Sequence, residues 1–136
     1  MAQKINTIYQ SLPACCKEWR NSSQDSESLA LSARFNFPDS FPGFEGHFPG
    51  QPVLPAIIQL GAVRYLAQCA LDTPLSPVAY GRTKFRGMIS PREEIEIAVD
   101  LALEAEQGQW VGRFAIKRGD QELVANGSCT FAAAKG

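Results

Sequence analysis

The sequence has few of the side chains that bind metals. It contains one histidine, His47, and four cysteines, no two of which are spaced as CxxC. One imidazole and irregularly spaced thiols do not supply the ligands of a zinc site, so we expect neither a metal nor another cofactor. Four cysteines in 136 residues are also too few for a disulfide scaffold, which favours reduced thiols in a cytoplasmic protein.

Strong net charge and uninterrupted apolar runs are absent as well. The formal net charge is -1, so no long-range field favours nucleic acid or an anionic membrane as a partner. The longest apolar stretch, residues 53–71, is interrupted by Pro55, Gln59, Arg64 and Gln68, and a membrane span rarely accommodates an arginine at its centre. The N-terminal stretch lacks the apolar segment of a signal peptide. We therefore expect a cytoplasmic protein without a membrane span.

The periodicity of the apolar residues predicts a single α+β domain over residues 1–136. Apolar residues alternate with polar ones in most of the expected strands, whereas the expected central helix is apolar nearly all round and should be surrounded by protein. A curved antiparallel sheet wrapped around one long helix buries both. The expected elements are a helix at about 4–12, a strand at 29–37, a loop at 38–54, the central helix at 55–71, and strands at 78–90, 94–104, 110–118 and 121–132.

The Pro/Gly-rich loop carries the most specific motif of the chain. Residues 46–55, GHFPGQPVLP, directly precede the expected helix and resemble the signature G-H-F-P-x-x-P-[VI]-[ML]-P of β-hydroxyacyl-[acyl-carrier-protein] dehydratases, the FabA/FabZ-like proteins of the hotdog fold. Residues 8–13, IYQSLP, resemble that family's N-terminal helix, and residues 84–94, KFRGMISPREE, resemble its K-F-R-x-x-V-x-P-G-D strand. Residues 55–60, PAIIQL, are particularly similar to the branch tied to aryl-polyene assembly.

This resemblance implies a fold, a reaction and partners. In the hotdog fold a curved antiparallel sheet wraps a central helix, and two subunits join their sheets into a homodimer, with higher oligomers left open. The implied reaction removes water from a 3-hydroxyacyl chain that acyl carrier protein presents on its 4'-phosphopantetheine arm. The implied setting is fatty acid or polyketide biosynthesis of the aryl-polyene type.

The resemblance also implies roles for individual residues. His47 matches the catalytic histidine and would act as the general base, a role that suits imidazole near neutral pH. Ala56, nine residues further on, matches the position whose backbone N–H holds the thioester carbonyl, where the family usually has glycine. Loop and tunnel residues would be Phe48, Pro49, Val53, Leu54, Pro55 and Ile57.

One position departs from the family pattern. The family's second catalytic residue is an Asp or Glu on the central helix, fourteen residues after the histidine, and here that position is Gly61. Gln68, which we expect on the same helix face as Gly61, is one candidate for the missing acid or for orienting water. Glu45, two residues before His47, is the other. The structural alternatives are that Gln68 pairs with the sheet or a dimer interface and that Glu45 is a solvated loop carboxylate.

Two function classes therefore stay open. The first is a dehydratase in which Lys84 and Arg86 dock the acidic carrier protein, although these two residues also suit a solvated strand face. The second is a catalytically impaired hotdog subunit that binds acyl chains or pairs with an active subunit. A hotdog thioesterase is a third hypothesis, but Gly61 counts against it because such enzymes normally use a helix carboxylate too.

Overall fold

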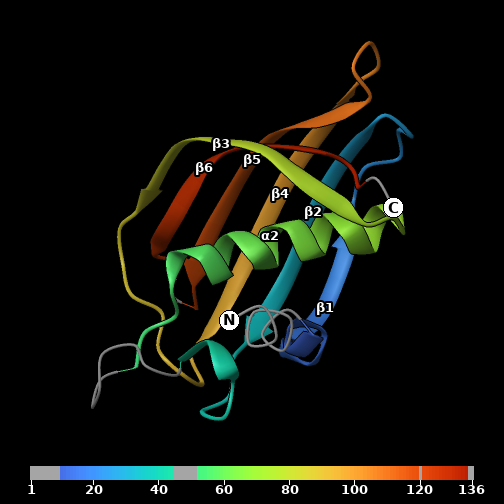
Figure 1. Ribbon diagram of the computed structural model, residues 1–136. Coiled ribbons are helices and arrows are strands. Elements are labelled where there is room, and N and C mark those ends of the chain that lie inside the picture. The colour runs from blue at the N-terminus through green and yellow to red at the C-terminus, as the bar shows by residue number, and fades with distance from the viewer. Residues whose placement is uncertain (1–9, 45–51, 120, 135–136) are drawn as a thin grey trace.

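The computed structural model describes residues 10–44, 52–119 and 121–134. Its centre is a six-stranded antiparallel sheet packed against the long helix α2 (Figure 1). Strand order across the sheet is β1-β2-β4-β5-β6-β3, so β1 and β3 are the edges. The elements are β1 (Cys16–Asn21), β2 (Ser28–Asn36), the 3-10 turn η1 (Pro42–Phe44), α2 (Ala56–Leu71), β3 (Leu75–Phe85), β4 (Glu94–Glu104), β5 (Gln109–Arg118) and β6 (Leu123–Ala133).

Alternating apolar residues give the sheet one buried face, and α2 covers it. Burial alternates residue by residue along β2 and β4, as a period of two requires. The strands curve around the helix, which lies against the same face of the sheet along its length (Figure 1). The predicted α+β architecture is thereby confirmed. Fully buried side chains from the two layers include Leu31, Phe35, Ile97, Ile116 and Phe131 from the sheet and Val63 and Leu66 from α2.

The first turn of α2 is set by proline. Pro55 stands at the N-cap with φ -64°, and no side chain caps the helix. The helix ends at Leu71, where Asp72 takes the left-handed conformation with φ 50°. It is observed from Ala56 to Leu71, close to the predicted range of 55–71. No helix within the described ranges is long and apolar enough to cross a membrane.

Most expected strand bounds agree with the structure to within two residues, but two elements differ more. The strand expected at 78–90 is observed as β3, Leu75–Phe85, and residues 86–93 form a loop. Regular pairing stops there because the N–H groups of Arg86 and Gly87 both bond to one carbonyl, that of Val124, at 2.7 and 3.2 Å. The N-terminal helix, expected to end at residue 12, continues to Cys15. The first part of its expected range, residues 4–9, lies outside the described residues.

Strand β1 was not predicted, and its burial pattern explains why. Five of its six residues are exposed and the sixth is half-buried, so its sequence, CKEWRN, shows no apolar alternation. Backbone pairing with β2 holds this edge strand in place. A strand that buries neither face gives no periodic signal in the sequence.

Substitution of Gly112 on β5 tests how closely β4 and β5 approach each other. A Cβ at this position would overlap the backbone carbonyl oxygen of Asp100 on β4, and a backbone atom has little room to move away. We expect Gly112→Ala to lower the free energy of unfolding by more than about 2 kcal/mol, measured by urea denaturation. Gly119→Ala is the matched control, because a Cβ there would meet nothing within 4 Å. Equal stability of the two variants would contradict this packing.

Candidate functional site

A hollow of about 360 Å³ lies at the N-terminus of α2. Residues 53–56 and Gln59 form one side of it, and residues 85–88 form the other. The hollow therefore joins the end of the GHFPGQPVLP motif and the start of α2 to the end of β3 and the loop that follows it. Both sides include residues of motifs that carry the family resemblance.

The start of α2 supplies free hydrogen-bond donors to this hollow. The N–H groups of Ile58 and Gln59 bond to the carbonyl of Pro55 at 3.1 and 3.2 Å. For the N–H groups of Ala56 and Ile57, no acceptor is found in the part of the chain that the structure describes. The unpaired N–H groups at a helix N-terminus carry partial positive charge and attract a developing negative charge. The predicted backbone donor Ala56 thus lies at the hollow and is exposed.

The walls of the hollow are largely apolar. Leu54 is fully buried, and its N–H bonds to the carbonyl of Ile89 at 2.8 Å, which ties the helix start to the 86–93 loop. Phe85 and Met88, which line the hollow, are 40% and 55% exposed. Ile57, predicted as a tunnel residue, does not line the hollow and is 66% exposed on the first helical turn. Such large exposed apolar side chains are typical of a surface that binds an apolar ligand or another protein.

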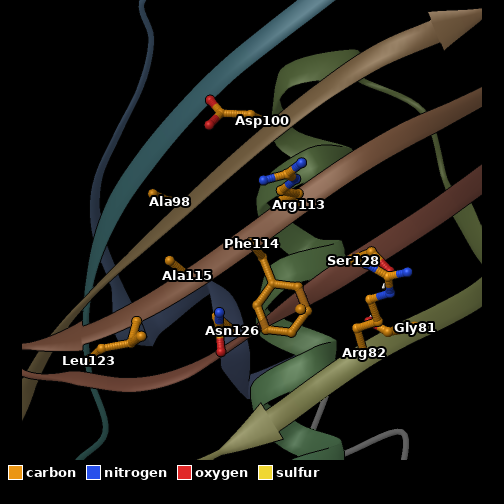
Figure 2. A pocket seen from close by; sticks show the side chains of 11 residues that line it. Gly81, Arg82, Ala98, Asp100, Arg113, Phe114, Ala115, Leu123, Asn126 and Ser128 are labelled. Atoms are coloured by element: carbon orange, nitrogen blue, oxygen red, sulfur yellow. Dashed lines mark hydrogen bonds between the residues drawn. The ribbon is translucent and has the colours of Figure 1, made fainter.

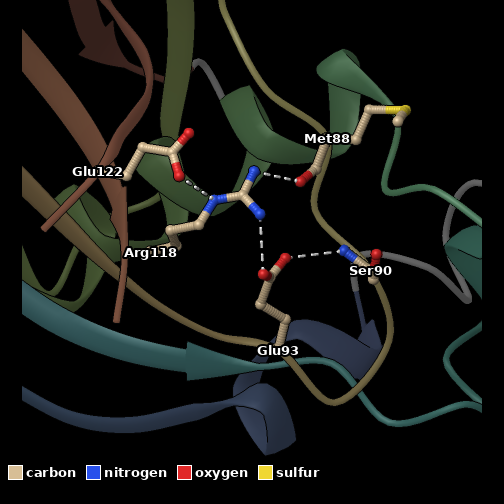
Figure 3. Close-up of polar contacts among 5 residues, drawn as sticks. All are labelled: Met88, Ser90, Glu93, Arg118 and Glu122. Atoms are coloured by element: carbon tan, nitrogen blue, oxygen red, sulfur yellow. Dashed lines mark hydrogen bonds and ion pairs between the residues drawn. The ribbon is translucent and has the colours of Figure 1, made fainter. Parts of the chain in front are cut away.

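An ion-pair network holds the 86–93 loop in place. The guanidinium of Arg118 on β5 lies 2.9 Å from the carboxylate of Glu93 and donates to the carbonyl of Met88 at 2.7 Å. The other carboxylate oxygen of Glu93 accepts from the N–H of Ser90 at 3.1 Å. The loop that walls the hollow is therefore fixed to the sheet. Figure 3 shows the five residues of the network: Met88, Ser90, Glu93, Arg118 and Glu122.

Gln68 makes the contact expected from its structural alternative. Its side-chain oxygen accepts a hydrogen bond from the N–H of Leu75 at 2.8 Å, so it holds the first residue of β3 against the last turn of α2. Gln68 does not line the hollow. Of the two roles left open by the sequence, this contact favours pairing with the sheet.

Sequence reasoning overlooked Gln59. This residue is 4% exposed, lines the hollow and donates from Nε2 to the carbonyl of Leu54 at 3.2 Å. The sequence indicates this residue only in that its amide stands in an otherwise apolar first turn and a half of the helix. Gly61, the position of the missing acid, is buried and lies about 140° around the helix axis from Ala56 at 3.6 residues per turn. Gly61 does not line the hollow.

The remaining candidates fall into two groups. Lys84 and Arg86 are both exposed at the end of β3 and just after it. Arg86 also lines the hollow, where its guanidinium donates to the side-chain oxygen of Asn126. Val53 and Pro55 line the hollow as well. The candidates that lie outside the described residues are Glu45, His47, Phe48 and Pro49.

A second and larger hollow, of about 760 Å³, lies on the outer face of the sheet. Small outward side chains such as Ala98 and Ala115 form its floor, and Asp100 and Arg113 lie opposite each other on adjacent strands (Figure 2). The strands separate this hollow from α2 in the close-up view (Figure 2). It lacks the helix N-terminus of the smaller hollow, which is therefore the better candidate for the site that the resemblance implies.

The thiols are poor nucleophiles. Burial raises the pKa of Cys15 to about 11. Burial, together with the neighbouring Cys69 and Cys15, raises the pKa of Cys16 to about 11. Burial alone raises the pKa of Cys129 to about 12. All three thiols are therefore protonated at neutral pH, and a protonated thiol does not carry out covalent catalysis.

Comparisons with known proteins agree on one family. A family model described as ApeI-like, ApeI dehydratase, matches residues 21–128. The chain is 30% identical over 99 residues to the 3-hydroxyacyl-[acyl-carrier-protein] dehydratase FabZ of Natranaerobius thermophilus, a match that covers 67% of this chain and 68% of that protein. It is 26% identical over 119 residues to the FabZ of Chlamydia pneumoniae, covering 81% of this chain and 76% of that protein.

A solved structure supports the fold. The chain is similar to a chain of the dehydratase heterocomplex ApeI:P from Xenorhabdus doucetiae, with a TM-score of 0.66 and 20% identity over 86% of this chain and 96% of that chain. At this identity the likeness shows a shared fold. The hotdog fold predicted from the motif is thereby confirmed.

The Arg118 network gives a prediction about the wall of the hollow. We expect Arg118→Met to lower the free energy of unfolding by about 1–2 kcal/mol, because it leaves the half-buried Glu93 carboxylate without its partner. Urea denaturation measures the change. Arg34→Met is the control, since Arg34 forms ion pairs only with exposed carboxylates at 3.5 and 3.9 Å, and we expect a loss below about 0.5 kcal/mol. Equal losses in both variants would contradict the network's role.

Proposed function

The chain belongs to the ApeI-like dehydratase family, and from this premise we propose that it removes water from 3-hydroxyacyl thioesters carried by acyl carrier protein in the cytoplasm. One observation supports the proposal: Ala56, whose N–H has no acceptor among the described residues, lines a largely apolar hollow directly after the GHFPGQPVLP motif. A thioester carbonyl needs such donors when its oxygen gains negative charge, and the acyl chain needs such walls.

In the proposed reaction, His47 takes the proton from C2 of the acyl chain. The electron pair of the C2–H bond moves toward the thioester carbonyl, so negative charge builds up on the carbonyl oxygen. The N–H of Ala56 and the positive end of the α2 dipole stabilise that charge. The C3–O bond then breaks, the C2=C3 double bond forms, and hydroxide leaves as water after it gains a proton.

That last proton needs a donor that this chain's helix does not provide. Gly61 has no side-chain acid, and its place on α2 faces away from the hollow. At this helix position a homodimer would add only a second Gly61, so its remaining candidate for the acid would be the loop carboxylate of Glu45. We therefore propose that a different subunit with a carboxylate completes the site, an arrangement for which the ApeI:P dehydratase heterocomplex is a precedent in the same fold.

A second candidate function follows from the same glycine. Without an acid from any source, the chain would be an acyl-binding or structural hotdog subunit. The donors at Ala56 and the walls of the hollow would then still bind the thioester without turning it over.

Removal of the proposed base tests the reaction. We expect His47→Ala to lower kcat/KM roughly a thousandfold, because general base catalysis contributes about that factor. The assay follows the enoyl thioester formed from a carrier-bound 3-hydroxyacyl chain, with this protein alone and mixed with a carboxylate-bearing hotdog subunit. Binding of a saturated acyl thioester should survive the substitution, since Ala56 is unchanged.

The outcomes separate the two functions. If the wild-type protein binds the thioester but turns it over in neither arrangement, it is an acyl-binding subunit. If it neither binds nor turns over any carrier-bound acyl chain, both functions are wrong.

Carrier docking is tested by charge reversal. We expect Lys84→Glu to raise KM for the carrier-bound substrate about five- to tenfold and to leave KM for the free pantetheine thioester unchanged, because only the carrier is acidic. Arg20→Glu is the matched control, since Arg20 is equally basic and exposed but lies on β1, the opposite edge of the sheet from β3. An equal effect of both reversals would show that only net charge matters.

A further inference from the structure

Among the described residues, Gln59 is the one polar side chain that is buried in the core. It is 4% exposed, whereas the other residues of that core are apolar. It sits on α2 one turn beyond Ala56 and lines the hollow at the helix start. A buried amide at this place requires an explanation, because burial of a polar group is unfavourable unless its hydrogen bonds are satisfied.

Half of the Gln59 amide is satisfied. Its Nε2 lies 3.2 Å from the carbonyl oxygen of Leu54. A carbonyl oxygen accepts but does not donate, so the nitrogen of the amide must face Leu54 and the oxygen must point elsewhere. The hydrogen bond therefore fixes the orientation of the whole carboxamide group.

The other half of the amide has no partner among the described residues. Oε1 of Gln59 is buried and has no hydrogen-bond donor within reach in the described structure. An unpaired buried acceptor has lost its hydrogen bonds to water without replacement, and a ligand with a donor would restore one of them. Because Gln59 lines the hollow, the geometry favours a ligand in the hollow as the source of that donor.

The spacing between Gln59 and Ala56 matches the reacting part of the substrate. Residues three apart on a helix lie on one face, with Cβ atoms about 5–6 Å apart. In a 3-hydroxyacyl thioester, the carbonyl oxygen and the 3-hydroxyl are separated by only three carbon atoms. A carbonyl held at the N–H of Ala56 therefore places the hydroxyl near the next turn of the helix, where Gln59 lies.

Depth distinguishes the two ends of the substrate. Ala56 is exposed and Gln59 is buried, so the line from Ala56 to Gln59 runs inward. The carrier arm approaches from solvent, and its amide N–H groups lie on the outer side of the thioester. The inner side belongs to the acyl chain, whose hydrogen-bond donor is the hydroxyl on C3.

We propose that Oε1 of Gln59 accepts a hydrogen bond from the 3-hydroxyl of the substrate and so selects 3-hydroxyacyl chains over saturated ones. This inference rests on the proposed function, because it assigns a contact within the same site. Gln59 positions the leaving group and does not supply the missing proton, since a carboxamide is not an acid at neutral pH. It holds the C3–O bond in place for the acid of the second subunit.

Calorimetry with three ligands tests the contact. The ligands are 3-hydroxyacyl, 3-fluoroacyl and saturated acyl pantetheine amides of one chain length. The amide linkage makes the C2 proton less acidic and prevents turnover, and fluorine has about the size of a hydroxyl but cannot donate. We expect the wild-type protein to bind the hydroxyl ligand about five- to tenfold more tightly than the other two, as one hydrogen bond provides.

Substitution of the amide should remove this preference. In Gln59→Met, which has a similar volume, the affinity ratio between hydroxyl and saturated ligands should fall to about one. In the matched control Gln68→Met the ratio should stay as in the wild type, because the Gln68 amide bonds to Leu75 outside the hollow. Thermal unfolding establishes that each variant is folded before ligand is added.

Each result has a defined meaning. A folded Gln59→Met that keeps the preference overturns the inference, as does an equal loss of affinity for all three ligands, which would place the contact on the pantetheine arm. If Gln59→Met does not fold, the inference is tested by the ratio of the wild-type protein's affinities for the hydroxyl and fluoro ligands. An affinity ratio of one overturns the inference. Failure of the wild-type protein to bind any of the three contradicts the proposed function itself.

Discussion

The burial of α2 by the curved sheet is the constraint on which the rest of the structure depends. The helix has sixteen residues, no side-chain cap, no acid in its first turn and a glycine in its interior, so it would be marginal in isolation. Its stability comes from packing against the apolar face of the sheet. An uncapped start is then tolerated, and the N–H groups of Ala56 and Ile57 have no acceptor among the described residues.

Contacts from three parts of the chain position that helix start. The N–H of Leu54 bonds to Ile89, the carbonyl of Leu54 accepts from Gln59, and Arg118 anchors the loop that contains Ile89. The loop after β3 and the helix therefore meet at Leu54, and Arg118 ties that loop to the sheet. A site that must hold a thioester carbonyl within hydrogen-bond distance benefits from this rigidity, since orientation is a large part of catalysis.

The hollow also lies at the end of an edge strand. β3 pairs with β6 on one side only, and Phe85, its last residue, is part of the rim. The backbone groups along the other side of β3 are available to a neighbouring chain. A second subunit joined along β3 would come close to the hollow, which agrees with the proposal that a partner brings the carboxylate that Gly61 lacks.

Local pattern in the sequence determined β2, β4 and α2, because alternating or near-continuous apolar residues have one way to be buried. The GHFPGQPVLP motif likewise indicated the family from its residues alone. The tertiary structure decided what the two glutamines of α2 do: Gln68 bonds to the start of β3, and Gln59 lines the hollow with one oxygen that has no partner among the described residues. The two are chemically identical, and only the neighbours that folding brings to each amide distinguish a structural role from a proposed binding role.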